Sequence, residues 1–106
     1  MPEATKKIDT DALQLAAAQA CGLLKVLANQ NRLLLLCQMT QADYCVSDLE
    51  SMTGIRQPTL SQQLTILRDE QMVSTRREGK QIIYSIASKE AMAVLGVLYQ
   101  QFCQGM

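Results

Sequence analysis

Two turn signals four residues apart, Gly54 and Pro58, constrain the fold of this chain more than any other feature. Glycine readily takes the left-handed conformation that ends a helix, and proline fits the first turn of a helix, where its missing N–H costs nothing. Together they predict that one helix ends at Thr53-Gly54 and that the next begins at Pro58. Two helices joined by a short turn of this kind form a helix-turn-helix.

The residues on either side agree with two short helices. Ser47 precedes Glu50 by three residues, the spacing at which two side chains bond to each other's backbone N–H groups at a helix start. We therefore expect Ser47 to be the N-cap of the first helix. The second helix is expected to bury one apolar face, because three leucines follow Pro58 at helical spacing: Leu60, Leu64 and Leu67.

The segment after this motif predicts a β-hairpin. MVSTRREGKQIIYSI carries β-branched and aromatic residues on both sides of a turn at Glu78-Gly79-Lys80. The order α-α-α-α-β-β-α then predicts a mainly α protein with a hairpin wing: a winged helix-turn-helix over residues 9 to 104, preceded by a flexible N-terminus at residues 1 to 8. The other predicted helices run from the cap Thr10 to about Ala28, from about Gln30 to Gln38, and from Ser88 to about Cys103.

The first and last predicted helices are apolar over a broad face. Such a helix needs cover on more than one side, either from a central position in its own chain or from a second subunit. Because 106 residues provide only one small core, we expect a homodimer. The apolar positions of the last helix are Met92, Val94, Leu95, Leu98, Tyr99 and Phe102.

Composition argues against several functions. Ten basic and ten acidic residues cancel, so the chain is no general polycation. It has no His, the commonest general base and nitrogen ligand of metals, and its four Cys form no CxxC pair. The longest apolar run, Leu33 to Cys37, is far below the ~18 residues of a membrane span. We predict a cytoplasmic protein that is not an enzyme and has no cofactor, metal site or membrane partner.

The second helix of the motif predicts a DNA interface. With its leucines inward it turns Gln62 and Gln63 toward solvent, and an amide can pair bidentately with adenine in the major groove, whereas hydroxyls such as that of Ser61 suit phosphate. Residues 55 to 81 hold five basic and three acidic side chains, a local excess of two. A merely solvated polar helix is the alternative, but a cationic hairpin directly after the motif favours DNA. The predicted contacts are Arg56, Gln57, Thr59, Ser61, Gln62, Gln63, Thr65, Arg76, Arg77 and Lys80.

Two stretches of the sequence carry a family resemblance. QPTLSQQLTILRDEQMVSTRREGKQIIYSI, with LLKVLANQNRLLLLCQM upstream, resembles the ArsR/SmtB family of dimeric bacterial transcriptional repressors, and the similarity runs from Ala20 to Cys103. The resemblance implies that the first and last helices form the dimer and that the paired recognition helices meet successive major grooves of an inverted repeat in operator DNA. It also implies that an inducer releases the operator.

Metal sensing is one alternative for the inducer. Many relatives bind thiophilic ions through a CVCDL box, which here reads CVSDL, so that Cys45 is present and Ser47 replaces the second thiol. A lone thiolate is a poor trap for arsenite or cadmium, and the His-containing site of other relatives is impossible here. A metal- or metalloid-responsive repressor is therefore disfavoured, although Cys21 or Cys45 could still supply one ligand.

The resemblance favours sulfur chemistry instead. Cys37 and Cys103 match the positions of the reactive dithiol in the subgroup of the biofilm growth-associated repressor, which senses persulfides and other reactive sulfur. The match implies a disulfide or longer polysulfide between them, release of operator DNA, and derepression of sulfide-detoxification genes. Cys21 and Cys45 are expected to be core residues. A winged-helix interaction module that no longer binds DNA remains a further alternative.

Overall fold

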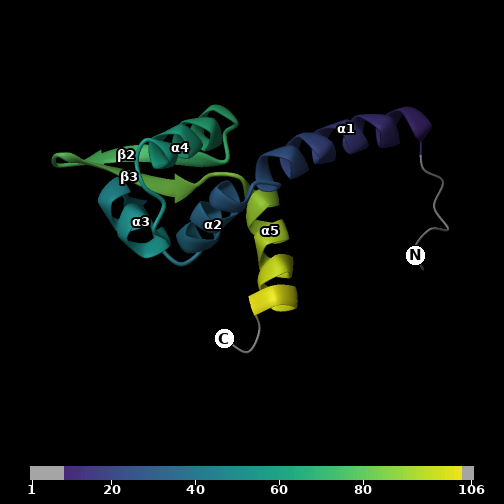
Figure 1. Cartoon of the computed structure of the whole chain (residues 1–106). Helices are drawn as coiled ribbons and strands as arrows, with labels where there is room; N and C mark the ends of the chain where they lie inside the picture. Colours follow the sequence, from purple (N-terminus) through teal and green to yellow (C-terminus); the bar gives the residue numbers. More distant parts are fainter. Residues whose placement is uncertain (1–8, 104–106) are drawn as a thin grey trace.

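The computed structural model describes residues 9 to 103, and it confirms the predicted winged helix-turn-helix (Figure 1). The predicted flexible N-terminus at residues 1 to 8 and the domain end at residue 104 lie outside this range. In chain order the elements are α1 (Thr10–Leu27), α2 (Gln30–Met39), β1 (Tyr44–Cys45), α3 (Val46–Thr53), α4 (Thr59–Asp69), β2 (Val73–Glu78), β3 (Gln81–Ile86), α5 (Lys89–Leu98) and a closing π turn, η1 (Tyr99–Cys103).

The hydrophobic core lies between α2, α3, α4 and the start of the sheet. The α4 leucines face inward as predicted, since Leu60 and Leu67 are 0 % and Leu64 is 2 % exposed. They pack in one cluster with fully buried leucines of α2 and α3. Burying a leucine side chain stabilises a fold by about 1.5–3 kcal/mol, so this cluster holds α4 with its polar face outward.

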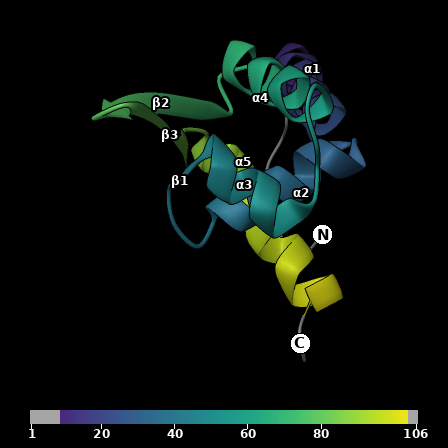
Figure 2. The same cartoon turned by 60° about the vertical axis from the view of Figure 1, so that its left-hand side comes forward.

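A three-stranded antiparallel sheet forms the wing, with strand order β1-β3-β2. The predicted hairpin pairs Glu78 with Gln81, and its turn contains Gly79 at φ 63°, a conformation that favours glycine. Strand β1 was not predicted. It is only two residues long and pairs Tyr44 with Tyr84 of β3. Figure 2 shows β2 and β3 extending as one ribbon beside the helices.

The helix ends differ from the prediction by one or two residues. Asp9, not Thr10, is the N-cap of α1, and its Oδ1 accepts a hydrogen bond from the Asp11 N–H at 3.1 Å. The predicted capping box is wrong, because α3 begins at Val46, directly after β1, which leaves Ser47 inside the first turn. Pro58 precedes α4 as its N-cap. Gly54 ends α3 with φ 76°, as predicted.

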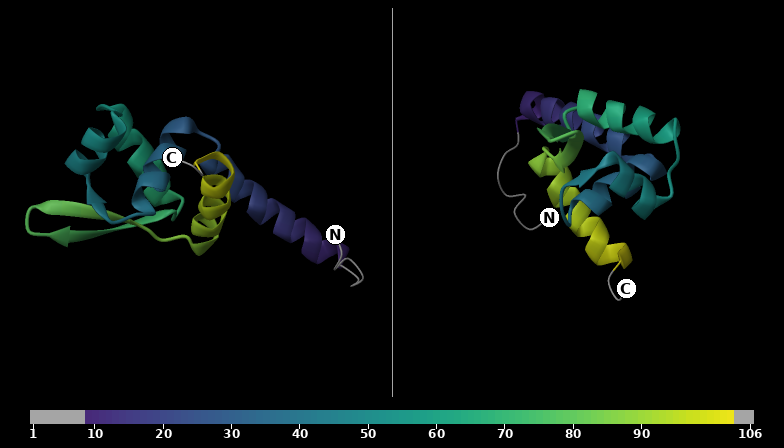
Figure 3. Two further views of the ribbon diagram at one scale, coloured as in Figure 1. Left: turned by 90° about the horizontal axis from the view of Figure 1, so that it is seen from below. Right: turned by 90° about the vertical axis from the view of Figure 1, so that its left-hand side faces the viewer.

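Helix α1 extends away from the rest of the chain (Figures 1 and 3). The Cα radius of gyration is 16.2 Å, against about 13 Å for a compact domain of this length. Large apolar side chains on α1 and at the C-terminal end are exposed: Leu13, Leu15, Leu24, Val97 and Phe102. Between residues 9 and 103 no single helix has the length and apolar composition of a membrane span, although α1 and α2, bent by 93°, reach both when joined.

Candidate DNA interface and thiol pair

The polar face of α4 forms one open surface. Ser61, Gln62 and Thr65 are exposed, whereas Thr59 and Gln63 are half-buried. Together they provide amide and hydroxyl groups along one side of a helix that the leucine cluster holds in place, which is the arrangement that major-groove recognition requires. A shallow hollow of about 580 Å³ lies along this face, lined by Pro58, Ser61, Gln62, Gln63, Thr65 and Ile66.

Two predicted DNA contacts also form hydrogen bonds with the backbone of α4. The Gln57 Oε1 accepts a hydrogen bond from the Ser61 backbone N–H at 3.0 Å, which satisfies one of the N–H groups left open at a helix start. The Thr65 hydroxyl donates to the Ser61 carbonyl at 2.8 Å. Gln57 therefore has a structural role in the free protein, which its residue type and position alone do not predict.

Gln63 is held by Arg32 of α2. The Arg32 Nη1 donates to the Gln63 Oε1 at 3.0 Å. Arg32 was not among the predicted site residues, and it is the one charged residue in the otherwise uncharged segment of α2. A lone arginine in such a helix needs hydrogen-bond acceptors nearby. Its presence among uncharged residues is therefore the sequence signal that Arg32 contacts a neighbouring element.

The cations of the wing are in two different situations. Arg76 is bound by Asp43 at 2.7 Å and by Glu78 at 2.7 Å, and its Nη1 also lies 3.2 Å from the Ser85 hydroxyl. The hydrogen bond from Arg76 holds the pKa of Asp43 below its usual value. Arg77 and Lys80 are exposed on the same hairpin, and both ion pairs in the described range involve Arg76. Arg77 and Lys80 are therefore better placed than Arg76 to meet phosphate.

The structure brings Cys37 and Cys103 to one groove. Cys37 lies near the end of α2 and Cys103 at the end of η1, and both are half-buried free thiols. Burial of the Cys37 thiol, and then the neighbouring Cys103, raises the pKa of Cys37 above its usual value. The groove has a volume of about 340 Å³, and its other lining residues are Leu34, Gln38, Thr40, Gln41, Leu95 and Tyr99.

The π turn aligns Cys103 with this groove. In an ordinary α-helix each residue turns by about 100°, so every fourth residue drifts forward by about 40°. Leu95, Tyr99 and Cys103 are spaced by four and all line the groove, because the wider π turn from Tyr99 to Cys103 counteracts that drift. The wider turn was not predicted, although the helix was correctly expected to reach about Cys103.

The other two cysteines lie apart from this pair. Cys45 is buried, as predicted, and its Sγ lies 3.2 Å from the Ser47 Oγ. Cys21 is exposed on α1, so the prediction that it is a core residue is wrong for the single chain. No group of three or more His, Cys, Asp or Glu side chains in residues 9 to 103 is arranged to hold a metal ion.

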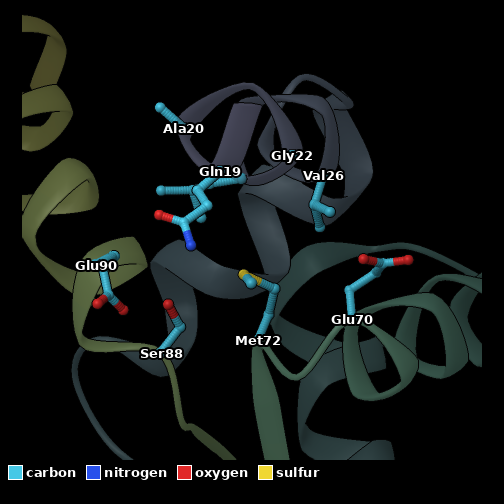
Figure 4. Close-up of a pocket in the computed structure, with 9 residues that line it drawn as sticks. Gln19, Ala20, Gly22, Val26, Glu70, Met72, Ser88 and Glu90 are labelled. Atoms are coloured by element: carbon cyan, nitrogen blue, oxygen red, sulfur yellow. The ribbon is translucent and has the colours of Figure 1, made fainter. Parts of the chain in front are cut away.

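A further pocket, of about 570 Å³, lies where α1 meets the end of α4 and the start of α5. Figure 4 shows Glu70 and Glu90 on opposite sides of it, with Gln19 on α1 and Ser88 at the start of α5.

Comparison with known proteins agrees with this geometry. The model of the family described as bacterial regulatory protein, arsR family, matches residues 29–75. The chain is 44 % identical over 97 residues to the biofilm growth-associated repressor of Agrobacterium fabrum, and the match covers 92 % of this chain and 83 % of that protein. This relative is a transcriptional regulator.

Solved structures share the fold over nearly the whole chain. The transcriptional repressor BigR from Xylella fastidiosa superposes with a TM-score of 0.83 at 38 % identity, covering 91 % of this chain and 98 % of that one. The homodimeric winged helix-turn-helix domain of Mb0332 from Mycobacterium bovis has a TM-score of 0.71 at 28 % identity, covering 92 % of this chain and 88 % of that one. The chain therefore belongs to the ArsR family of DNA-binding bacterial transcription regulators, and it has their winged helix-turn-helix fold.

Proposed function

We propose that this repressor of the ArsR type senses persulfides or polysulfides through Cys37 and Cys103, and that a crosslink between them releases operator DNA. The observation that supports the proposal is that the two thiols, 66 residues apart in the chain (103 minus 37), line one groove. The groove is partly apolar and opens to solvent, so a small sulfur species can enter while the thiols remain partly shielded.

The chemistry needs only thiolates and the persulfide RS–SH. A thiolate attacks the terminal sulfur, the S–S bond breaks, RS⁻ leaves, and the cysteine becomes Cys–S–SH. The second thiolate then attacks the cysteine-bound sulfur, forms the Cys37–Cys103 disulfide and expels HS⁻. Two thiols are thereby oxidised, and the transferred sulfur is reduced to sulfide. If both cysteines are persulfidated first, attack of one persulfide anion on the other Sγ gives a trisulfide and again expels HS⁻.

The order of attack follows from the environment of Cys37. Burial raises the pKa of the Cys37 thiol above its usual value, which makes Cys37 a poor first nucleophile at neutral pH, so we propose that the first attack is made by Cys103. Cys37 then acts as the resolving thiol.

The crosslink has a physical route to the DNA-binding surface. It would tie α2 to the end of the last helix, and α2 packs directly against α3 and α4. We propose that a homodimer forms through the exposed apolar faces of α1 and α5 and presents two α4 helices to an inverted repeat. A restraint on α2 and α5 would then act on the spacing of the recognition helices. A shift of only ~1–3 kcal/mol in this equilibrium changes operator affinity from several-fold to a hundredfold.

The ten predicted DNA contacts stay part of this proposal with different weights. Arg56, Arg77 and Lys80 are the exposed cations that suit phosphate, and Gln62 is the exposed amide that suits a base edge. Gln57 and Arg76 are already engaged by Ser61 and by carboxylates, so we expect smaller contributions from them. The others are Thr59, Ser61, Gln63 and Thr65.

The test compares inducers on one complex. The purified protein, bound to its operator duplex, is treated with glutathione persulfide, zinc, cadmium or arsenite, and release is followed by fluorescence anisotropy while mass spectrometry maps the cysteines. We expect release by persulfide alone, with a Cys37–Cys103 bridge. Cys37→Ser and Cys103→Ser should bind DNA but resist release, whereas the matched control Cys21→Ser should respond normally. Release of the operator duplex by a metal, with Cys37 and Cys103 unmodified, would contradict the proposal.

The alternative functions have separate signatures in the same assay. A metal-responsive repressor would release DNA on metal addition, and an interaction module would show no salt-dependent, sequence-selective binding at all. The described residues hold no group of three metal-binding side chains, so they give no support to a metal-responsive repressor. The polar face of α4 gives no support to an interaction module that does not bind DNA.

A further inference from the structure

Arg32 lies at a corner where three helices meet. It is on the first turn of α2, whose axis is bent by 93° from that of α1, and it contacts α4 through Gln63. Its guanidinium uses three nitrogens on three acceptors. Nε donates to the Val26 carbonyl at 2.7 Å, Nη2 to the Lys25 carbonyl at 3.3 Å, and Nη1 to the Gln63 Oε1 at 3.0 Å.

The two carbonyl contacts complete the C-terminal end of α1. An α-helix leaves its last four carbonyls without helical partners. In α1 the Leu24 carbonyl accepts from the Ala28 N–H and the Leu27 carbonyl accepts from the Asn29 N–H, both at 2.8 Å. The carbonyls of residues 25 and 26 are the two that remain, and Arg32 binds both. The end of α1 thus holds the Arg32 guanidinium in place, and the same guanidinium also contacts Gln63.

The contact with Gln63 sets the direction of its amide. A guanidinium has only donors, so the group that faces Arg32 must be the amide oxygen, and the amide nitrogen must point away from it. Gln63 lines the hollow on the polar face of α4, and its N–H₂ group is accessible to solvent, because the described residues contain no buried side-chain nitrogen or oxygen without a hydrogen-bond partner. Bidentate pairing with adenine needs the oxygen and the nitrogen of one amide to face the same base, whereas the Gln63 oxygen faces Arg32, which binds one of its two lone pairs.

We propose that Arg32 is a positioning residue for DNA recognition, which turns Gln63 into a hydrogen-bond donor toward DNA and couples the end of α1 to the recognition helix. This inference rests on the proposed role of α4 in sequence recognition. It replaces the expectation that Gln63 pairs bidentately with adenine. Gln63 instead recognises an acceptor, such as guanine O6 or N7 or thymine O4, while the exposed Gln62 keeps both of its amide groups for bidentate pairing.

The test is a double-mutant cycle read as base preference. Wild-type protein selects duplexes from a random-sequence pool, and each base pair of the enriched half-site is then replaced in turn. Arg32→Met and Gln63→Ala should each lower discrimination at one and the same base pair, by roughly five- to tenfold. The double variant should lose no more than either single variant. Gln62→Ala is the matched control, and its loss should fall on another base pair and add to that of Arg32→Met.

A second variant keeps the contact with Arg32 and changes only what faces DNA. Gln63→Glu retains an oxygen for Arg32 and replaces the outward N–H₂ with an acceptor, so the fold should melt no lower than wild type. Its preference at that base pair should change toward a base that donates, such as cytosine N4 or adenine N6. Thermal unfolding of all variants, followed by circular dichroism, separates loss of fold from loss of recognition.

Several results would overturn the inference. Additive losses from Arg32→Met and Gln63→Ala, an equal loss on every duplex with Arg32→Met, or an unchanged base preference in Gln63→Glu would each show that Arg32 does not position Gln63. A wild-type protein that enriches no sequence would overturn the recognition role of α4 itself, and the inference with it. The two failures are therefore distinguishable.

Discussion

Crosslinking Cys37 to Cys103 should make the folded chain markedly more stable. A bridge between residues 66 positions apart (103 minus 37) restricts the unfolded chain much more than the folded one, in which both thiols already line one groove. The chain-entropy relation for a closed loop of this length gives a stabilisation of about 4 kcal/mol when the bridge fits without strain. For a domain of this size, that corresponds to a rise in melting temperature of about 18 °C.

The assay is thermal unfolding of the oxidised and the reduced protein at one protomer concentration, because the stability of a dimer depends on concentration. Intact mass spectrometry identifies the bridge: a disulfide lowers the mass by about 2 Da, and each additional sulfur raises it by about 32 Da. Cys37→Ser and Cys103→Ser, treated in the same way, should melt alike before and after treatment, and Cys21→Ser should behave as wild type.

The size of the rise also measures the strain of the bridge. A trisulfide spans a wider gap than a disulfide, so the two oxidised forms should differ in stability if the groove holds the sulfurs too far apart for a direct bond. A bridged protein that melts at or below the temperature of the reduced protein would refute the proposal that the folded chain accommodates a bridge between the two thiols of the groove.

Four other results are expected. Arg77→Ala should reduce the slope of log affinity against log salt by about one in gel-shift titrations. Arg76→Ala should change this slope less, because carboxylates hold the Arg76 guanidinium. Equal slopes for the two variants would contradict this expectation. Leu64→Ala should destabilise the fold by about 2–5 kcal/mol in urea unfolding. Phe102→Ser, at a side chain 80 % exposed in the single chain, should weaken the homodimer at least about tenfold in sedimentation without lowering helix content. Since a raised pKa keeps Cys37 protonated to higher pH, its alkylation rate should still rise above about pH 9, where an ordinary thiol levels off.

The fold was predictable where local signals and burial agree. Gly54 ends a helix because its φ is positive, and the leucines of α4 are buried because their spacing matches one helix face. The hairpin and the last helix follow from equally local patterns. These elements need no information from distant parts of the chain, so a single sequence is sufficient to place them.

The errors and omissions arise where distant residues decide. Strand β1 exists because Tyr44 pairs with Tyr84, forty positions away, and that pairing moves the start of α3 ahead of Ser47. Asp9 and Thr10 are both good caps, and only the backbone geometry chooses between them. The contact of Arg32 with Gln63 joins two helices across 31 positions, which periodicity within either helix does not reveal.

The candidate site was predictable as a set of residue types but not as a set of contacts. The resemblance singled out Cys37 and Cys103, and the structure places both in one groove. The local surroundings, however, distinguish Arg77 from Arg76 and Gln62 from Gln63, although each pair is adjacent in sequence. Neighbours of the same chemical type thus acquire different tasks from the elements packed against them.

The wider winding at the end of the last helix determines the direction in which the Cys103 side chain points around the helix axis. If residues 99 to 103 rewound into an ordinary α-helix, the Cys103 side chain would swing by roughly 40° or more around the helix axis and leave the line that Leu95 and Tyr99 mark along the groove. Any change that stiffens or loosens this final turn therefore alters how readily the Cys103 sulfur reaches the Cys37 sulfur.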